Sequence, residues 1–183
     1  RVFSLSSLIF LSSCGSSDNQ FELIGNADVI DGTMIYVLQA DQNNQPYIKD
    51  STSVQSNTFK FKGISSTPQI SYIQVEGVNG YVLAILENGD IKADIYKDSI
   101  SKSKVYGTKS NDDFIKYKLE TKYLVDVMNN ISSDAQNSIM NGDVATAMKL
   151  EKEYNSKERE VMLYEWDFIV ENLDSYMSAL LLE

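Results

Sequence analysis

The 183-residue sequence contains no histidine and one cysteine. Without histidine, the chain cannot form a Ser-His-Asp triad, use an imidazole general base or bind a metal through imidazole. A single cysteine excludes an intrachain disulfide and a dithiol redox pair within this chain. The 16 basic residues are outnumbered by 26 acidic ones, and the net charge of −10 argues against nucleic-acid binding, which needs a basic surface.

The remaining composition is that of an ordinary globular protein. Apolar residues make up 43% and charged residues 23% of the chain, and the length suffices for one or two domains with a buried core. No Gly-rich phosphate loop and no Gly-x-Ser-x-Gly elbow is present. The sequence therefore predicts a folded protein without a recognisable catalytic motif.

The amino terminus has the features of an export signal. It begins at Arg1, which suggests a truncated start, and continues into an apolar stretch too short to span a bilayer. Residues 11–14, Leu-Ser-Ser-Cys, resemble the bacterial lipobox, in which the chain is cleaved before an acylated cysteine. This resemblance implies a signal peptide at residues 1–13, lipid attachment (palmitate) at Cys14, and a lipidated tether at residues 14–20. The alternative is that Cys14 is a buried structural thiol.

Three dipeptides, Asp31-Gly32, Asn79-Gly80 and Asn88-Gly89, predict tight turns between strands. A turn at residues 88–89 would place Leu86 opposite Ile91, and a turn at residues 79–80 would place Leu86 opposite Ile73. Both registers put the same apolar side chains on one face, which predicts a meander with a shared buried side. The predicted face consists of Ile73, Val75, Val82, Ala84, Leu86, Ile91, Ala93 and Ile95.

Two further turns extend this prediction. The turn at Asp31-Gly32 would direct Met34 and Tyr36 to the buried side, and a turn at Ser56-Asn57 would pair Val54 with Phe59. About seven strands with short connections predict an antiparallel β-sandwich or partly open barrel over residues 21–108.

Residues 109–183 have helical spacing instead. Ser110 followed by Asp113 predicts a helix start, Asn141-Gly142 a stop, and Asp143 the cap of a second helix. The polar residues at 129–134 either interrupt the first helix or end it. Asp174-Ser175 is expected to cap a last short helix that ends near Leu182. The expected fold class is thus α+β, with a β domain followed by a helical hairpin or bundle.

Candidate functional residues are few. Glu151, Glu153, Glu158 and Glu160 interleave with basic residues, which favours a solvated helix face over a catalytic carboxylate pair. The loop at residues 41–45 carries oxygen ligands but lacks the spacing of a calcium loop. Trp166 lies at helical spacing with apolar neighbours, which favours a core position over sugar stacking. The turn at residues 88–89 would make Tyr81 and Tyr96 cross-strand neighbours, and they are the candidate binding face.

An ordered set of short motifs runs through the first 111 residues. The motifs are Phe21-x-Leu23-x-Gly25, Asp31-Gly32 followed by Tyr36 and Leu38, Asp50-Ser51, Phe59-x-Phe61-x-Gly63, Leu86-Glu87-Asn88-Gly89, and Gly107-Thr108 followed by Asn111. Together they resemble the uncharacterised amino-terminal domain of Bacteroidota lipoproteins that carry a thioredoxin-like domain at their carboxyl end. The resemblance covers roughly residues 21–111 and extends more loosely through the helices.

This resemblance implies a membrane-attached thiol–disulfide oxidoreductase or a peroxiredoxin-like relative. The redox site of such proteins is a Cys-x-x-Cys in the thioredoxin-like domain, and no residue of this chain matches it. We therefore expect a non-catalytic accessory module without a cofactor or metal, in a fragment that lacks the second domain.

The expected location is the cell envelope, on an outer membrane and facing the periplasm. Expected partners are the membrane, through Cys14, and either the missing thioredoxin-like domain or another protein, with self-association as a further option. An alternative from a different class is a stand-alone lipoprotein that binds a glycan or a peptide on its β face.

Overall fold

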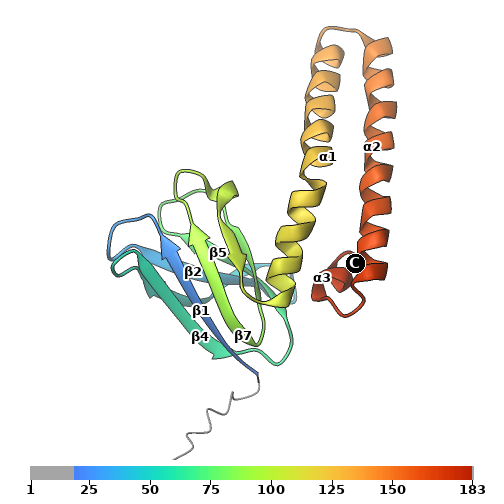
Figure 1. Ribbon diagram of the computed structural model, residues 1–183. Coiled ribbons are helices and arrows are strands. Elements are labelled where there is room, and N and C mark those ends of the chain that lie inside the picture. The colour runs from blue at the N-terminus through green and yellow to red at the C-terminus, as the bar shows by residue number, and fades with distance from the viewer. Residues whose placement is uncertain (1–18, 183) are drawn as a thin grey trace, which may run out of the picture.

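The computed structural model describes residues 19–182, so the predicted signal peptide and Cys14 lie outside the described residues. Eight strands are followed by three α-helices, as shown in Figure 1. The strands are β1 (Gln20–Ala27), β2 (Met34–Ala40), β3 (Pro46–Ser53), β4 (Thr58–Ile64), β5 (Gln69–Val75), β6 (Val82–Leu86), β7 (Gly89–Ile95) and β8 (Lys104–Tyr106). A short 3-10 helix, η1 (Ile100–Lys102), precedes β8, and the α-helices are α1 (Lys109–Met140), α2 (Val144–Glu171) and α3 (Tyr176–Leu180).

The strands form two four-stranded sheets that pack as a sandwich. One sheet has the order β4-β1-β7-β8 and the other the order β3-β2-β5-β6. The predicted α+β class with a β-sandwich is confirmed. One detail was wrong, because the sheets are not purely antiparallel: β1 pairs in parallel with β7, with Leu23 beside Ile91. Between β1 and β7 the chain crosses to the second sheet twice. It returns first at β4, antiparallel to β1, and then at β7, parallel to β1.

The core lies between the two sheets. Every residue of the predicted buried face is in it, and strand alternation directs their polar neighbours outward. The full core consists of Leu23, Ala27, Ile35, Val37, Val54, Phe59, Phe61, Ile73, Val75, Val82, Ala84, Leu86, Ile91, Ala93, Ile95 and Val105.

The predicted hairpin at Asn88-Gly89 is wrong. β6 pairs with β5 and β7 pairs with β1 and β8, so this turn carries the chain from one sheet to the other. β5 and β6 do pair, but with Val82 rather than Leu86 opposite Ile73. The buried face was nevertheless correct, because a four-residue shift keeps the alternation and the inner faces of both sheets are apolar.

The Asp31-Gly32 turn also connects the two sheets rather than two paired strands. Here the predicted face was wrong: Ile35 and Val37 are buried, whereas Met34 and Tyr36 are only half-buried. The connection between β1 and β2 spans residues 28–33. In a two-residue hairpin, the turn fixes which side chains of the two strands face the core. The longer connection between β1 and β2 does not fix this.

The Ser56-Asn57 turn was predicted correctly as a turn. Ser56 and Asn57 have φ values of 51° and 61°, and Gln55 bridges to Thr58 across them. The pairing ends there, because β3 and β4 continue into different sheets. Val54 and Phe59 are consequently both buried in the core rather than paired along two strands.

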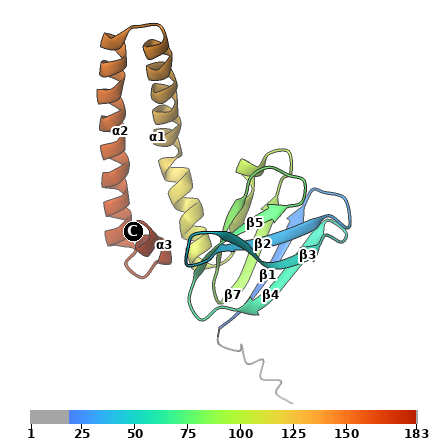
Figure 2. The same ribbon diagram turned by 180° about the vertical axis from the view of Figure 1, so that it is seen from behind.

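The helices form a long hairpin that stands beside the sandwich, which we call the arm (Figures 1 and 2). α1 is continuous through the polar residues 129–134, so the predicted interruption does not occur. Its N-cap is Thr108 rather than Ser110, and its end at Asn141-Gly142 is confirmed, with Gly142 at a φ of 75°. As predicted, the carboxylate of Asp143 accepts a hydrogen bond from the Thr146 backbone N–H at 3.0 Å.

The side chains packed between α1 and α2, which we call the seam, explain why α1 continues through these polar residues. Positions spaced alternately by three and four residues are buried or half-buried on both helices, which is the pattern of an antiparallel two-helix coiled coil. On α1 they run from Phe114 to Ser138, and on α2 from Ala147 to Phe168. Tertiary packing along this seam overrides the low helix propensity of the Asn and Ser residues. Among the described residues, no helix has the length and apolarity needed to cross a membrane.

Candidate functional site at the arm and its junction

The predicted binding face at Tyr81 and Tyr96 is not formed by paired strands. Both side chains are exposed, at 57% and 45%. The Tyr81 ring contacts Tyr72 edge-on at 6.3 Å, while the Tyr96 backbone N–H donates to Ser103 Oγ at 2.9 Å. Because β6 and β7 lie in different sheets, the register that would make these two tyrosines cross-strand neighbours is absent. A binding role for either residue stays a prediction.

The loop at residues 41–45 is a surface turn, as favoured from the sequence. Asp41 Oδ1 accepts the backbone N–H groups of Asn43 at 2.8 Å and Gln45 at 2.9 Å, so the carboxylate orders its own loop. Across residues 19–182, no cluster of three or more Asp, Glu, His or Cys side chains is arranged to hold a metal ion. The four candidate glutamates, at positions 151, 153, 158 and 160, are exposed, and Glu160 pairs with Lys157, which confirms the solvated helix face.

Trp166 was predicted to lie in the core, and this is wrong. Its side chain is 55% exposed, because Tyr164 and Phe168 occupy the seam on either side of it. Periodicity alone identified an apolar face of α2 but did not distinguish the side that contacts α1 from the opposite side.

The arm is joined to the sandwich by a buried amide. Asn111, in the first turn of α1, is 1% exposed and lies against the fully buried Ile85 of β6. Its Oδ1 accepts the Ile85 N–H at 2.9 Å, and its Nδ2 donates to the Ile85 carbonyl at 2.8 Å and to Thr108 Oγ1 at 2.8 Å. The side chain thus hydrogen-bonds to β6 as a neighbouring strand would, and satisfies both backbone groups of Ile85.

A carboxylate fixes the same turn of α1 from the other side. Glu87 accepts the Ser110 backbone N–H at 2.8 Å and the Ser110 hydroxyl at 2.6 Å. Asp112 accepts the Gly107 N–H at 2.9 Å. A negative charge at a helix N-terminus is favourable, because the free N–H groups there carry partial positive charge. Two loops and the first turn of α1 therefore form one rigid junction.

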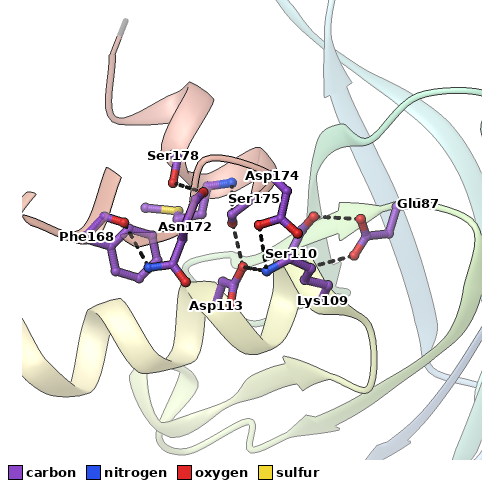
Figure 3. A network of polar contacts seen from close by, with 10 residues as sticks. Glu87, Lys109, Ser110, Asp113, Phe168, Asn172, Asp174, Ser175 and Ser178 are labelled. Carbon is purple, nitrogen blue, oxygen red and sulfur yellow. Dashed lines mark hydrogen bonds and ion pairs between the residues drawn. The ribbon is translucent and has the colours of Figure 1, made fainter. Parts of the chain in front are cut away.

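α3 is held against the base of the arm by a polar network (Figure 3). Ser175 caps α3 by accepting the Met177 N–H at 3.2 Å, and its hydroxyl donates to Asp113 of α1 at 2.5 Å. Lys109 reaches Asp113 at 3.1 Å and Asp174 at 3.7 Å. These contacts confirm Ser175 as a cap, and they keep the chain beyond α2 folded back toward the sandwich.

A comparison with known families places the chain in one of them. The family model described as a domain of unknown function (DUF4369) matches residues 17–114, more than half of the chain. The chain belongs to the DUF4369 family. No curated protein and no solved structure matches it significantly. The DUF4369 match covers the sandwich and the first turn of α1, including Glu87 and Asn111, while most of the arm lies beyond it.

The two main residues of the junction could be picked out from the sequence, but their contacts could not. Glu87 and Asn111 both belong to the motifs that carry the family resemblance, and they meet around β6 only in the fold. In this chain both residues make hydrogen bonds that join the sandwich to the first turn of α1, which is a structural role.

The interior of the arm near the junction is aromatic. The rings of Tyr117, Tyr164 and Phe168 lie within 6.3 Å of one another, centroid to centroid. The Tyr117 hydroxyl donates to Glu165 at 2.5 Å, and the Tyr164 hydroxyl donates to Glu120 of α1. Burial, and then these bonds to carboxylates, raise the pKa of both hydroxyls above the ordinary tyrosine value, so both tyrosines are neutral hydrogen-bond donors at physiological pH.

The arm carries two groups of exposed apolar side chains. Near its tip, residues of both helices line a shallow groove of about 500 Å³, and only Glu151 among them is charged. Nearer the base, α2 carries a second set of exposed apolar side chains, which includes Trp166. Large exposed apolar patches on a folded protein mark interaction surfaces. Both groups of exposed apolar side chains lie on the arm, beyond the residues that the DUF4369 model matches, apart from the sandwich.

Proposed function

We propose that this chain is the non-catalytic amino-terminal module of a membrane-anchored lipoprotein of the thiol–disulfide oxidoreductase type in Bacteroidota. Its role is to hold and orient a partner, either the protein's own thioredoxin-like domain or a second protein, at a fixed position relative to the membrane. Support comes from the lipobox-like residues 11–14, the DUF4369 match, and a composition that lacks histidine and a Cys-x-x-Cys. The proposed location is the periplasmic side of the outer membrane.

The observation that carries this proposal is the rigid junction around Asn111. Its hydrogen bonds to Ile85, together with those of Glu87 to Ser110, tie the first turn of α1 to the sandwich. A buried amide needs hydrogen-bond partners, and those of Asn111 include both backbone groups of Ile85, so the start of α1 is fixed to β6. The junction therefore suits a module that sets the geometry of a partner.

The direction of the arm fits an anchored protein. In Figures 1 and 2, the start of β1 and the tip of the arm lie at opposite ends of the molecule. An acyl group on Cys14 would hold Asn19 within about 18 Å of the membrane, because five residues span at most about 3.6 Å each. The 32-residue helix α1 is about 48 Å long, so the tip would point away from that membrane.

A second candidate is a stand-alone envelope lipoprotein that binds a glycan or a peptide on its β face. The exposure of Tyr81 and Tyr96 favours it, since aromatic rings at a surface stack on sugars. An accessory module shows no affinity for a polysaccharide panel, whereas a glycan binder shows a change in tyrosine fluorescence on titration.

The anchor is tested by metabolic labelling with an alkyne analogue of palmitate. The wild-type protein is expected to take up the label and to fractionate with membranes. Cys14→Ser should lose the label and leave the membrane fraction, because serine offers no thiol for the acyl linkage. Ser16→Ala, two residues away, serves as the matched control and should behave as wild type. Equal labelling of Cys14→Ser and wild type, or none in either, would contradict the proposed anchor.

A further inference from the structure

An open hollow lies on the outer face of the sheet β4-β1-β7-β8. It has a volume of about 280 Å³ and is lined by residues of β1, β7 and β8. Strand pairing sets its shape, because Lys92 of β7 lies between Ile24 of β1 on one side and Tyr106 of β8 on the other. Ile24 and Tyr106 are two strands apart, about 10 Å between their Cα atoms, so an apolar group placed between them contacts both.

Two charged side chains in this hollow differ from the other charged side chains of the same face. Asp90 and Lys92 are exposed and line the hollow, and neither side chain makes a hydrogen bond or an ion pair within residues 19–182. Their charged neighbours on the face are paired with one another. These pairs are Glu22 with both Lys60 and Lys62, and Asp94 with Lys104.

The position of Asp90 favours a positive charge beside it. Asp90 lies opposite Glu22 in the parallel pair of β1 and β7, and like charges opposite each other destabilise a sheet. Lys60 and Lys62 neutralise Glu22 from the β4 side, whereas no basic side chain within residues 19–182 pairs with Asp90. An ammonium group of a ligand beside Asp90 would remove this repulsion.

Lys92 offers the opposite charge at a defined separation. It follows Asp90 by two residues on the same face of β7, so their Cα atoms are about 7 Å apart. Two residues of extended peptide span about 7 Å, and with free ends they carry an ammonium and a carboxylate at that separation. Asn26 also lines the hollow, and its amide has no hydrogen-bond partner within residues 19–182, so it can donate to and accept from a peptide group.

We propose that this hollow binds a dipeptide with free ends and an apolar side chain. The ammonium group of the ligand meets Asp90, its carboxylate meets Lys92, and its apolar side chain packs between Ile24 and Tyr106. Because the hollow is open and both charges are solvated, the dissociation constant should be on the order of 1 mM. The hollow lies on the sandwich rather than on the arm, so this binding is separate from the role proposed for the module.

The test is a titration of the full chain, isotope-labelled and in mild detergent, with alanyl-leucine, followed by amide NMR. The backbone signals of residues 90–93 and of Tyr106 should shift and saturate. N-acetylation or C-terminal amidation of the dipeptide should each weaken binding about fivefold, because each removes one charge. Equal binding of the N-acetylated form would show that the hollow takes only a free carboxyl end, and would overturn the role of Asp90. No shift up to roughly 20 mM, far above the expected dissociation constant, or equal shifts with sodium acetate, overturns the proposal.

Variants with matched controls test the two charged residues. Lys92→Met and Asp90→Asn should each weaken binding about fivefold. Lys102→Met and Asp134→Asn make the same changes at exposed positions outside the hollow and should leave binding unchanged. Asp90→Asn should also bind the free and the N-acetylated dipeptide equally, because the ammonium group has lost its partner. Site variants that bind as tightly as the controls would contradict the proposed site. None of these results depends on acylation or on a redox domain.

Discussion

Replacing Asn111 with alanine should lower the free energy of unfolding by about 3 kcal/mol. The change removes three hydrogen bonds and leaves the N–H and the carbonyl of Ile85 without partners inside the protein. Each buried polar group that loses its partner costs about 1–3 kcal/mol, and Ile85 is fully buried. The loss is measured by urea denaturation followed by far-ultraviolet circular dichroism.

Two variants separate the hydrogen bonds from the effect of side-chain size. Asn130→Ala makes the same change at an exposed position of α1 and should alter stability by less than about 0.5 kcal/mol. Asn111→Asp keeps the size and the acceptor but places a carboxylate oxygen against the Ile85 carbonyl, so it should also be strongly destabilising. If Asn111→Ala costs under about 1 kcal/mol, Asn111 is not what holds the arm in place, and the rigid junction is wrong.

The second large effect is expected at Gly25, where alanine should cost about 2–3 kcal/mol through overpacking. Gly25 of β1 pairs with Phe59 of β4, and an added Cβ would lie 2.1 Å from Phe59 Cζ. The Phe59 ring is 2% exposed and belongs to the core, so it cannot turn outward into solvent without losing its core contacts. Thermal or urea unfolding measures the loss.

The same two strands offer a matched comparison. Gly63 of β4 pairs with Phe21 of β1, so each strand carries a phenylalanine that covers the other strand's glycine. Phe21 is only half-buried, so its ring can turn outward, and Gly63→Ala should cost about 1 kcal/mol, at the low end for overpacking. In Gly25→Ala combined with Phe59→Leu, the smaller side chain should make the loss less than the sum of the two single losses. Additive losses would show that the ring does not limit the space at Gly25.

This pairing explains why the same motif, a Phe followed four residues later by a Gly, occurs twice in the sequence. Phe21-x-Leu23-x-Gly25 and Phe59-x-Phe61-x-Gly63 are the same pattern on two antiparallel neighbours, in a register that places each Phe opposite the other's Gly. The family match over residues 17–114 includes both copies. Alternation along single strands was readable from the sequence, whereas the pairing between β1 and β4 requires the long-range order of the sheets.

The same distinction explains what sequence reasoning predicted for the sandwich. The buried face of β5, β6 and β7 was correct, because alternation is a local property that survives a shift of register by an even number of residues. The strand neighbours were wrong, because Asn88-Gly89 has the same local preference whether it closes a hairpin or crosses between sheets. Turn residues thus identified where the chain reverses, but not which strand it meets next.

For the arm, the sequence predicted where the helices begin and end. It did not predict which side of each helix is buried. Asp143 and Ser175 cap their helices as the sequence indicates, through side-chain bonds to nearby N–H groups. The exposure of Trp166 depends on which side of α2 meets α1, and both sides are apolar. Asn111 was noticed within a motif, but its contact with Ile85 joins residues 26 positions apart and appears only in the fold.

The most direct test of the central claim is to read the gene beyond the codon for Glu183. The proposed function predicts that the reading frame continues for about 130 to 150 residues, an ordinary length for one more domain, and encodes a Trp-Cys-x-x-Cys. The chain would then be the accessory part of an oxidoreductase. A stop codon directly after Glu183 would contradict that account and favour a stand-alone binding or structural lipoprotein.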